Sequence, residues 1–228
     1  MTDLTSADLD VLAQWDTPTI CNALEITNPE RRSFGYNVKP LTCLDPSLPP
    51  MIGYARTAKI RAAAPATVAA DRLEYYEYVA TGPGPTIVII EDVDPSPGYG
   101  AFWGEVQTNV HKGLGSRGCV TNGCYRDVTD SAPGFQLLGG MVNPSHAHVH
   151  LIEIKCPVNV HGMEVVHGDI IHADLHGAVV VPRDAVKKIP DAVGLLIRRE
   201  AVILEAAKAP DFNFEKLKVA IGTQADIH

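Results

Sequence analysis

The sequence predicts an α+β protein of 228 residues that forms one domain over residues 1–228, with its core at about residues 50–185. Helical patterns are concentrated at the two ends, and short strand patterns fill the middle. Several central strands follow each other too closely for a helix to connect each pair, which disfavours a purely doubly wound sheet. No internal repeat or linker divides the chain. Helical extensions on both sides of a strand-rich core are therefore expected.

The first half begins with helical patterns. Residues 6–14 alternate acidic with apolar side chains and predict a short amphipathic helix capped by Ser6. A second helix is expected from Thr17, as its cap, with Pro18 in the first turn. The other elements expected in this half are a loop at 27–50, a strand at 53–60, a helix at 66–79 with Leu73, Tyr76 and Val79 inward, a strand at 86–91 and a loop at 94–100.

The second half is richer in strand signals, because polar and apolar residues alternate in short runs between glycines. The pattern becomes helical over residues 185–208, although Pro190 and Gly194 interrupt it, and a weaker helical segment covers 214–221. The strands expected here are 119–121, 148–154, 158–160 and 178–181.

Composition limits the classes of function. Apolar residues make up 46% of the chain and charged residues 20%, enough for a sizeable core, and the net charge of −8 does not suggest nucleic-acid binding. We expect no secretion signal in the first residues and no membrane span. The cysteines form no CxxC pair, so reduced thiols in a cytoplasmic protein are expected rather than a zinc ribbon. They lie at positions 21, 43, 119, 124 and 156.

A glycine turn at residues 104–107 (GEVQ) follows the apolar strand at 86–90. It can be read simply as a turn into a helix that continues through Val110. The same geometry leaves N–H groups of a helix start free to attract an anion. Glu105 would then need a cation or a shared proton beside that anion.

A second turn at residues 122–123 (NG) leads into Arg126 and Asp127. An adjacent Arg-Asp pair is often only a surface ion pair, but this pair lies just past a tight turn, where loops commonly carry function. Arg supplies a planar fork for a carboxylate, and Asp supplies a hard oxygen for magnesium or manganese. Together with the glycine turn, the pair suggests an enzyme that acts on a small oxo-acid.

The histidines leave alternatives open. His146, His148 and His150 would share one face of a strand and could bind zinc, but no fourth soft ligand is evident. A strand face toward solvent or a neighbouring subunit explains them equally. Cys119 and Cys124 lack a diagnostic His-acid partner, which makes nucleophilic catalysis a poor interpretation. Other histidines and acids near glycines are interpreted as turn residues, namely His161, His167, His172, His176, Asp169 and Asp174.

Five segments in order resemble the RraA-like family, which includes 4-hydroxy-4-methyl-2-oxoglutarate aldolases. The family's usual aspartates at two of these positions are replaced by Asn22 and Asn122. The segments are 16–24 (DTPTICNAL), 53–58 (GYARTA), 104–107 (GEVQ), 122–127 (NGCYRD) and 165–182 (VVHGDIIHADLHGAVVVP).

The resemblance implies a layered β/β/α swivelling-type domain that assembles as a homotrimer or homohexamer with sites between subunits. It implies that the backbone of 104–107 holds the carboxylate of the oxo-acid, that Arg126 binds the oxo-acid, and that Asp127 ligates Mg²⁺ or Mn²⁺. Glu105 would hold metal-bound water, and a neighbour's C-terminal helix would lend an acid, with Glu200 the candidate and Glu205 the reserve.

The implied activity is a class II aldolase that releases pyruvate from a 4-hydroxy-2-oxo acid and also decarboxylates oxaloacetate. The family also contains regulators that bind ribonuclease E, so a non-catalytic binding protein is the alternative. The substitutions at Asn22 and Asn122 and the three histidines lead us to expect an unusual distal half of the substrate.

Overall fold

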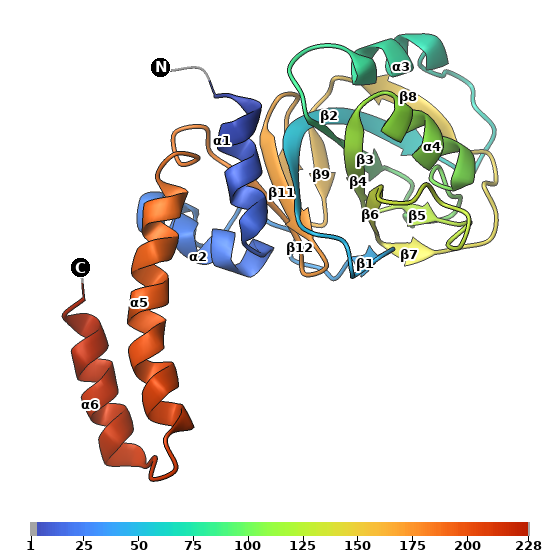
Figure 1. Ribbon diagram of the computed structural model, residues 1–228. Helices are drawn as coiled ribbons and strands as arrows, with labels where there is room; N and C mark the ends of the chain where they lie inside the picture. Colours follow the sequence, from blue (N-terminus) through green and yellow to red (C-terminus); the bar gives the residue numbers. More distant parts are fainter. Residues whose placement is uncertain (1–3, 228) are drawn as a thin grey trace.

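The computed structural model describes residues 4–227 and shows a mixed α/β fold built on a curled sheet of eight strands, with helices at both ends of the chain (Figure 1). Residues 1–3, which begin the segment read for a secretion signal, lie outside the described part. The mixed class and the helical ends agree with the sequence prediction. The layered β/β/α swivelling-type description stays a prediction.

The centre of the sheet is parallel and its edges are antiparallel. The strand order is β1-β6-β4-β3-β2-β11-β12, and β8 pairs with β2 beside β11. The pairs β2–β3, β3–β4 and β4–β6 are parallel. The strands are β1 Thr42–Cys43, β2 Met51–Arg61, β3 Thr86–Asp92, β4 Ser116–Thr121, β6 Gln136–Gly139, β8 His150–Ile154, β11 Ile170–Asp174 and β12 Gly177–Val181.

Two crossover helices explain two of the three parallel pairs. Helix α3, Arg72–Ala80, connects β2 to β3, and helix α4, Glu105–Gly113, connects β3 to β4. A parallel pair needs such a long connection, whereas the antiparallel β11–β12 pair needs only a tight turn. Two small two-stranded sheets complete the strands: β5 Cys124–Tyr125 with β7 Met141–Val142, and β9 Val158–Val160 with β10 Met163–Val165.

The N-terminal helices are correct in position but differ in their caps. Thr5, not Ser6, caps α1 (Ser6–Asp10) through a capping box with Asp8, and the helix then tightens into a 3₁₀ turn at Val11–Gln14. Asp16, not Thr17, caps α2 (Thr17–Thr27), and Pro18 lies in its first turn as expected. Both corrections shift the cap by one residue, to a side chain that can reach the free amides. A further 3₁₀ turn follows at Pro29–Arg31.

Helix α3 is shorter than predicted, and of its three side chains expected inward Val79 is buried, Tyr76 is half-buried and Leu73 is exposed. Asp71 accepts hydrogen bonds from the amides of Leu73 and Glu74, so the helix starts at Arg72 rather than at residue 66. Leu73 is 77% exposed, whereas Tyr75 and Val79 are buried. The prediction was wrong for Leu73. Tyr75 lies in the interior instead, where its hydroxyl is 2.7 Å from His111 Nε2 on α4.

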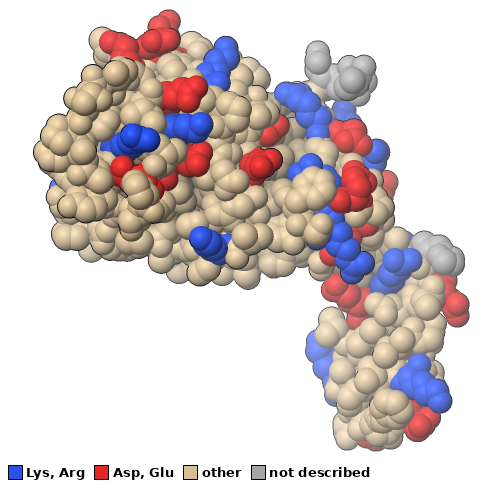
Figure 2. All heavy atoms as spheres, turned by 180° about the vertical axis from the view of Figure 1, so that it is seen from behind, with Lys and Arg blue, Asp and Glu red and all other residues tan. Residues whose placement is uncertain are grey.

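The C-terminal helices α5, Ile189–Lys208, and α6, Phe214–Ala225, form a hairpin that projects from the body of the molecule (Figure 1). Pro190 does not interrupt α5 but occupies its first turn, where a missing N–H costs nothing. Charges of both signs are interspersed on this arm and on the visible face of the body (Figure 2). Within residues 4–227, none of the helices combines the length and apolar character needed to span a bilayer.

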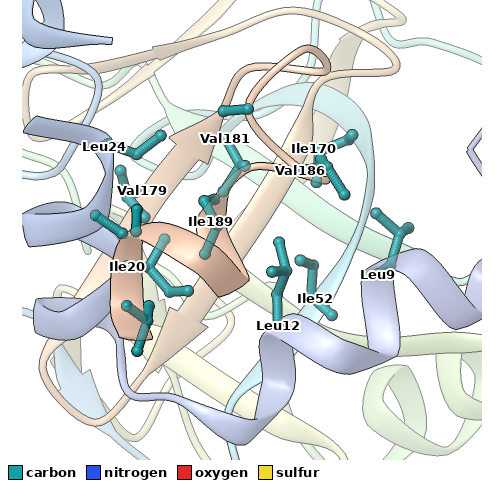
Figure 3. Close-up of a cluster of buried hydrophobic side chains, with 14 of the residues drawn as sticks. Leu9, Leu12, Ile20, Leu24, Ile52, Ile170, Val179, Val181, Val186 and Ile189 are labelled. Carbon is teal, nitrogen blue, oxygen red and sulfur yellow. The ribbon is translucent and has the colours of Figure 1, made fainter. Parts of the chain in front are cut away.

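A hydrophobic cluster joins the two ends of the chain (Figure 3). Side chains of α1 and its 3₁₀ turn, of α2 and of the start of α5 pack on β2, β11 and β12. The residues labelled in the close-up are Leu9, Leu12, Ile20, Leu24, Ile52, Ile170, Val179, Val181, Val186 and Ile189. Burial of such side chains contributes about 1.5–3 kcal/mol each, so the ends of the chain stabilise the sheet.

His172 anchors α2 within this region and is not the turn residue that was predicted. It is fully buried in β11, with Nδ1 3.1 Å from Thr17 Oγ1 and Nε2 3.2 Å from the Leu12 carbonyl oxygen. Burial lowers the pKa of His172, which keeps the ring neutral. The neighbouring Asp174 does form the predicted turn, by accepting from the His176 amide, and also accepts from the Thr17 amide at 2.8 Å.

Candidate active site

The fold brings the two predicted turns together at one edge of the sheet. Strands β3 and β4 are adjacent and parallel, so the segments that follow their carboxyl ends emerge on the same side. Trp103 forms a parallel bridge with Tyr125, and the Arg126 amide donates to the Trp103 carbonyl at 3.0 Å. Gly104 therefore lies against Arg126 and Asp127.

Asp127 acts as a cap for α4 from another segment. Gly104 is the N-cap residue but has no side chain to accept from the first turn. Instead, Asp127 Oδ2 accepts from the Glu105 amide at 3.2 Å. The amides of Val106 and Gln107, in the same first turn, have no intrahelical acceptor. Thus the Glu105 amide serves Asp127, and the next two amides are the ones suited to an anion.

Gly104 is glycine for a steric reason. A Cβ at this position would lie 2.5 Å from Asp127 Oδ2 and 3.2 Å from Arg126 Cγ. The backbone at Gly104 is extended, with φ −174°, so its conformation alone would admit other residues. The close approach of the Asp127 carboxylate is what excludes a side chain.

Asp127 adopts the left-handed backbone conformation, with φ +53°. Aspartate is among the few residues other than glycine that visit this region readily. Its carbonyl oxygen accepts from the amides of Asp130, at 3.1 Å, and Ser131, at 2.9 Å, and also from Ser131 Oγ. The turn after Asp127 thus fixes the direction of its side chain.

Arg126 and Asp127 form a loose ion pair rather than a closed one. Arg126 Nε lies 3.6 Å from Asp127 Oδ2, and the two side chains are 38% and 34% exposed. A pair this accessible to water adds little to stability. The guanidinium fork accordingly remains accessible to an incoming carboxylate.

These residues line one cavity of about 610 Å³. All the site residues predicted within one chain, Gly104, Glu105, Val106, Gln107, Arg126 and Asp127, are in its wall. Sequence reasoning missed the remaining residues of the wall other than His146 and His150, namely Ala69, Ala70, Arg72, Ala101, Phe102, Val149 and Leu151. No local motif marks these residues. The pairing of β8 with β2 places Leu151, and the Ala70 amide donates to the Leu151 carbonyl at 2.9 Å.

The predicted row of three histidines on one strand face is wrong. Strand β8 begins only at His150, and Ala147 has φ +44°, which breaks the extended alternation before it. His146 and His150 nevertheless line the cavity, whereas His148 does not. Glu200 lies on the projecting helix α5 and is not among the cavity residues of its own chain.

Asn122 has a structural role in the chain. Its side-chain Oδ1 accepts from the Asp92 amide at 2.8 Å, and its Nδ2 donates to the Asp92 carbonyl at 2.9 Å. These bonds tie the end of β4 to the end of β3. Asn122 does not line the cavity that holds Arg126, and Asn22 is exposed on α2.

The inner side of α4 packs on aromatic rings. His111 is fully buried, with Nε2 2.7 Å from the Tyr75 hydroxyl and Nδ1 2.6 Å from the Gln107 carbonyl oxygen. A carbonyl only accepts, so Nδ1 carries the proton and Nε2 accepts from Tyr75. Burial lowers the pKa of His111 to about 4. The neutral ring holds the first turn of α4 in place.

The thiols are poorly suited to nucleophilic catalysis, in agreement with the sequence interpretation. Burial raises the pKa of Cys21 and of Cys124 to about 11, and it also raises the pKa of Cys119 well above its usual value. Thiolate is the nucleophilic form, so these groups are unreactive near neutral pH.

The acidic groups suit a hard cation held largely by water and substrate. Among residues 4–227, no three His, Cys, Asp or Glu side chains converge as a complete metal site. Asp127 Oδ1 has no partner among these residues, whereas Oδ2 is engaged. Mg²⁺ commonly binds through one or two carboxylates and retains several waters, and Asp127 beside Glu105 fits that need.

Comparison with known proteins identifies relatives. An uncharacterized protein of Methanocaldococcus jannaschii is 34% identical over 107 residues, which is 46% of this chain and 51% of the relative. The chain therefore matches about half the length of that relative.

Two solved structures share the fold. One, an uncharacterized protein from Pseudomonas syringae pv. tomato, superposes with a TM-score of 0.72 at 20% identity over 97% of this chain and 96% of its own. The other, Streptomyces coelicolor RraAS2, described as an unusual member of the RNase ES inhibitor RraA protein family, has a TM-score of 0.68 at 20% identity and covers 88% of this chain and 96% of its own.

The family comparison covers the site itself. The profile of the RraA-like family, described as Aldolase/RraA, matches residues 17–180, which include both site turns and the sheet between α2 and β12. The family contains aldolases as well as regulators of the RraA type. By this match over most of its length, the chain belongs to the RraA-like family.

Proposed function

We propose that this protein is a divalent-metal-dependent aldolase that cleaves a 4-hydroxy-2-oxo acid to release pyruvate, with accompanying oxaloacetate decarboxylation. One observation carries the proposal. Arg126 and Asp127 lie against the first turn of α4 in the wall of a single cavity, beside the amides of Val106 and Gln107. A protein that only binds another protein has no need of this combination of anion-binding and cation-binding groups.

Asp127 would hold Mg²⁺ or Mn²⁺ through its uncommitted oxygen, and Glu105 would hold a water of the cation. When bound, the cation supplies Lewis-acid stabilisation of negative charge on the oxo-acid. Glu105 is exposed and lines the cavity, which leaves its carboxylate accessible to such a water.

The protein groups then have defined tasks. The amides of Val106 and Gln107 bind the substrate carboxylate, and the Arg126 fork neutralises charge on the oxo-acid end. A water held by Glu105 accepts the C4 hydroxyl proton as the C3–C4 bond breaks. The bonding electrons remain on C3 as the pyruvate enolate, and a proton added at C3 completes pyruvate. Loss of CO₂ from oxaloacetate produces the same enolate.

The active form is proposed to be a homotrimer or homohexamer. Each subunit is proposed to be a layered β/β/α swivelling-type domain, with the sites between subunits. Glu200, or Glu205 in reserve, would reach a neighbouring subunit's site from the projecting arm. All five cysteines are free, which supports the proposed cytoplasmic location. A small oxo-acid is the expected partner, without nucleic acid or membrane.

The test measures pyruvate release from 4-hydroxy-2-oxoglutarate and from oxaloacetate, with Mg²⁺, with Mn²⁺ and after EDTA treatment. Asp127→Asn is the informative variant, because asparagine tolerates the left-handed backbone and removes only the charge. We expect both activities to require metal and both to be lost in Asp127→Asn. Full turnover after complete metal removal would refute the mechanism.

The second candidate function is regulation by binding a ribonuclease or another protein. It is favoured by the fold shared with RraAS2, whose description names it as a member of an RNase inhibitor family. Stoichiometric recovery of a nuclease in a pull-down, together with no metal-dependent turnover of oxo-acids, would support this function over the first.

A further inference from the structure

The cavity has a second set of polar groups that the proposed cleavage does not use. We propose that one part of its wall, here called the histidine wall, binds an uncharged, hydroxylated tail of the substrate. The histidine wall is formed by Ala69, Ala70, Arg72, His146, Val149, His150 and Leu151. This inference rests on the proposed function and names the substrate class: 4-hydroxy-2-oxo acids with further hydroxyl groups beyond C4.

The imidazoles of the histidine wall are held as hydrogen-bond acceptors. His146 Nδ1 lies 2.7 Å from the Ala147 carbonyl oxygen, and His150 Nδ1 lies 2.7 Å from the His148 carbonyl oxygen. A carbonyl cannot donate, so each Nδ1 carries a proton. In the neutral ring, Nε2 then has a free lone pair. Neither Nε2 has a partner among residues 4–227.

Gln107 supplies a complementary donor. Arg72 Nε donates to the Tyr76 hydroxyl at 3.2 Å, and the Arg72 guanidinium lies over the Tyr76 ring at 5.6 Å from its centroid. The Tyr76 hydroxyl is thereby directed to donate to Gln107 Oε1 at 3.0 Å. With its oxygen committed, Gln107 has its amide N–H groups available in the cavity wall.

This arrangement favours hydroxyl groups. Two acceptors and one amide donor match groups that both donate and accept, whereas imidazole lone pairs repel a carboxylate. Phe102, Val149 and Leu151 give the same cavity apolar surface for the carbon chain. Arg72 also lines the cavity, and its remaining N–H groups suit an anion, so a carboxylate tail is the competing possibility in the test.

The experiment compares three substrates with the same pyruvoyl half. Cleavage of 4,5,6-trihydroxy-2-oxohexanoate gives pyruvate and glyceraldehyde, 4-hydroxy-2-oxohexanoate gives pyruvate and propanal, and 4-hydroxy-2-oxoglutarate gives pyruvate and glyoxylate. The double variant His146→Leu/His150→Leu is compared with His148→Leu, a matched control that lies between them and does not line the cavity.

We expect the wild type and His148→Leu to prefer the trihydroxy substrate over its deoxy analogue in kcat/KM. The double variant should lose about 25-fold of that preference, roughly fivefold for each hydrogen bond. If the double variant does not fold, His146→Leu alone, at an exposed position, should lose about fivefold. Equal rates on the two substrates in the wild type, or an unchanged preference in the variant, would overturn the inference.

The remaining outcomes separate the two proposals. A preference for 4-hydroxy-2-oxoglutarate would overturn the hydroxylated tail but uphold the aldolase. If no substrate is turned over, oxaloacetate included, the proposed function fails. In that case, calorimetric titration of 4,5,6-trihydroxy-2-oxohexanoate into each variant measures its binding and tests the histidine wall. Weaker binding to the double variant than to His148→Leu supports it, and equal binding to both overturns it.

Discussion

The contact between Gly104 and Asp127 makes Gly104→Ala a sharp test of the site. The new Cβ would lie 2.5 Å from Asp127 Oδ2, whereas ordinary contact requires 3.4 Å or more, so the carboxylate must move by 0.9 Å, the difference between these two distances. A displacement of about 1 Å in a catalytic group can reduce turnover by about 100-fold. The moving group is the end of a side chain, so we expect the loss of stability to be about 1 kcal/mol or less.

The assay measures kcat/KM for metal-dependent pyruvate release together with the melting temperature. Gly113→Ala is the matched control, because it lies in the same helix, is exposed, and its Cβ would meet nothing within 4 Å. The control should retain activity and gain up to about 1 kcal/mol of stability from helix propensity. Gly104→Ala with activity equal to that of Gly113→Ala would refute the role assigned to the Asp127 carboxylate.

Three further predictions concern the substrate fork, pH and the core. Arg126→Lys should lower kcat/KM at least about tenfold, because a point charge cannot replace a bidentate fork; near-normal kinetics would contradict this. The pKa of His111 is about 4 when folded and about 6.5 when unfolded, so the unfolded state binds more protons between these values and stability falls as pH falls from 6.5 toward 4. His111→Gln should therefore remove about 2 kcal/mol of the decrease in unfolding free energy between pH 7 and pH 5, measured by denaturant titration; an unchanged pH slope would count against the buried neutral ring. Leu12→Ala should destabilise by about 2–5 kcal/mol in the same titration, because Leu12 is fully buried where the two ends of the chain meet; a loss below about 1 kcal/mol would exclude this packing.

The parts of the fold that could be predicted from sequence are those with strong local signals. The apolar run at 86–90 predicts a strand and the pattern at 185–208 predicts a helix, and the structure has β3 and α5 there. The predicted starts of α2 and α3 were wrong because an aspartate accepts hydrogen bonds from the first-turn amides and so sets the start of the helix. Asp16 does this at α2 and Asp71 at α3. On α3, Val79 is buried as predicted, but Leu73 is exposed and Tyr75 is buried in its place, hydrogen-bonded to His111.

For the candidate site, the sequence identified residues that the structure brings together, but not their surroundings. The spacing of β3 and β4 makes Gly104 and Arg126 meet, since parallel neighbours end at the same edge. The pairing of Lys59 and Arg61 in β2 with β8 was not visible, because it joins segments about ninety residues apart without a local pattern. The sequence pattern therefore predicts a strand face for His146 and His150 rather than a place in the cavity wall.

The position of β2 has a consequence for how the chain is synthesised. One edge of β2 pairs with β3, which follows soon after it in the chain. The other edge pairs with β8 at His150–Ile154 and β11 at Ile170–Asp174, which are synthesised much later. A nascent chain thus carries an open, largely apolar strand edge until β8 and β11 have left the ribosome. Chains cut short before β11 should be captured by chaperones or aggregate, so the sheet is completed as one unit and only after β11 has emerged.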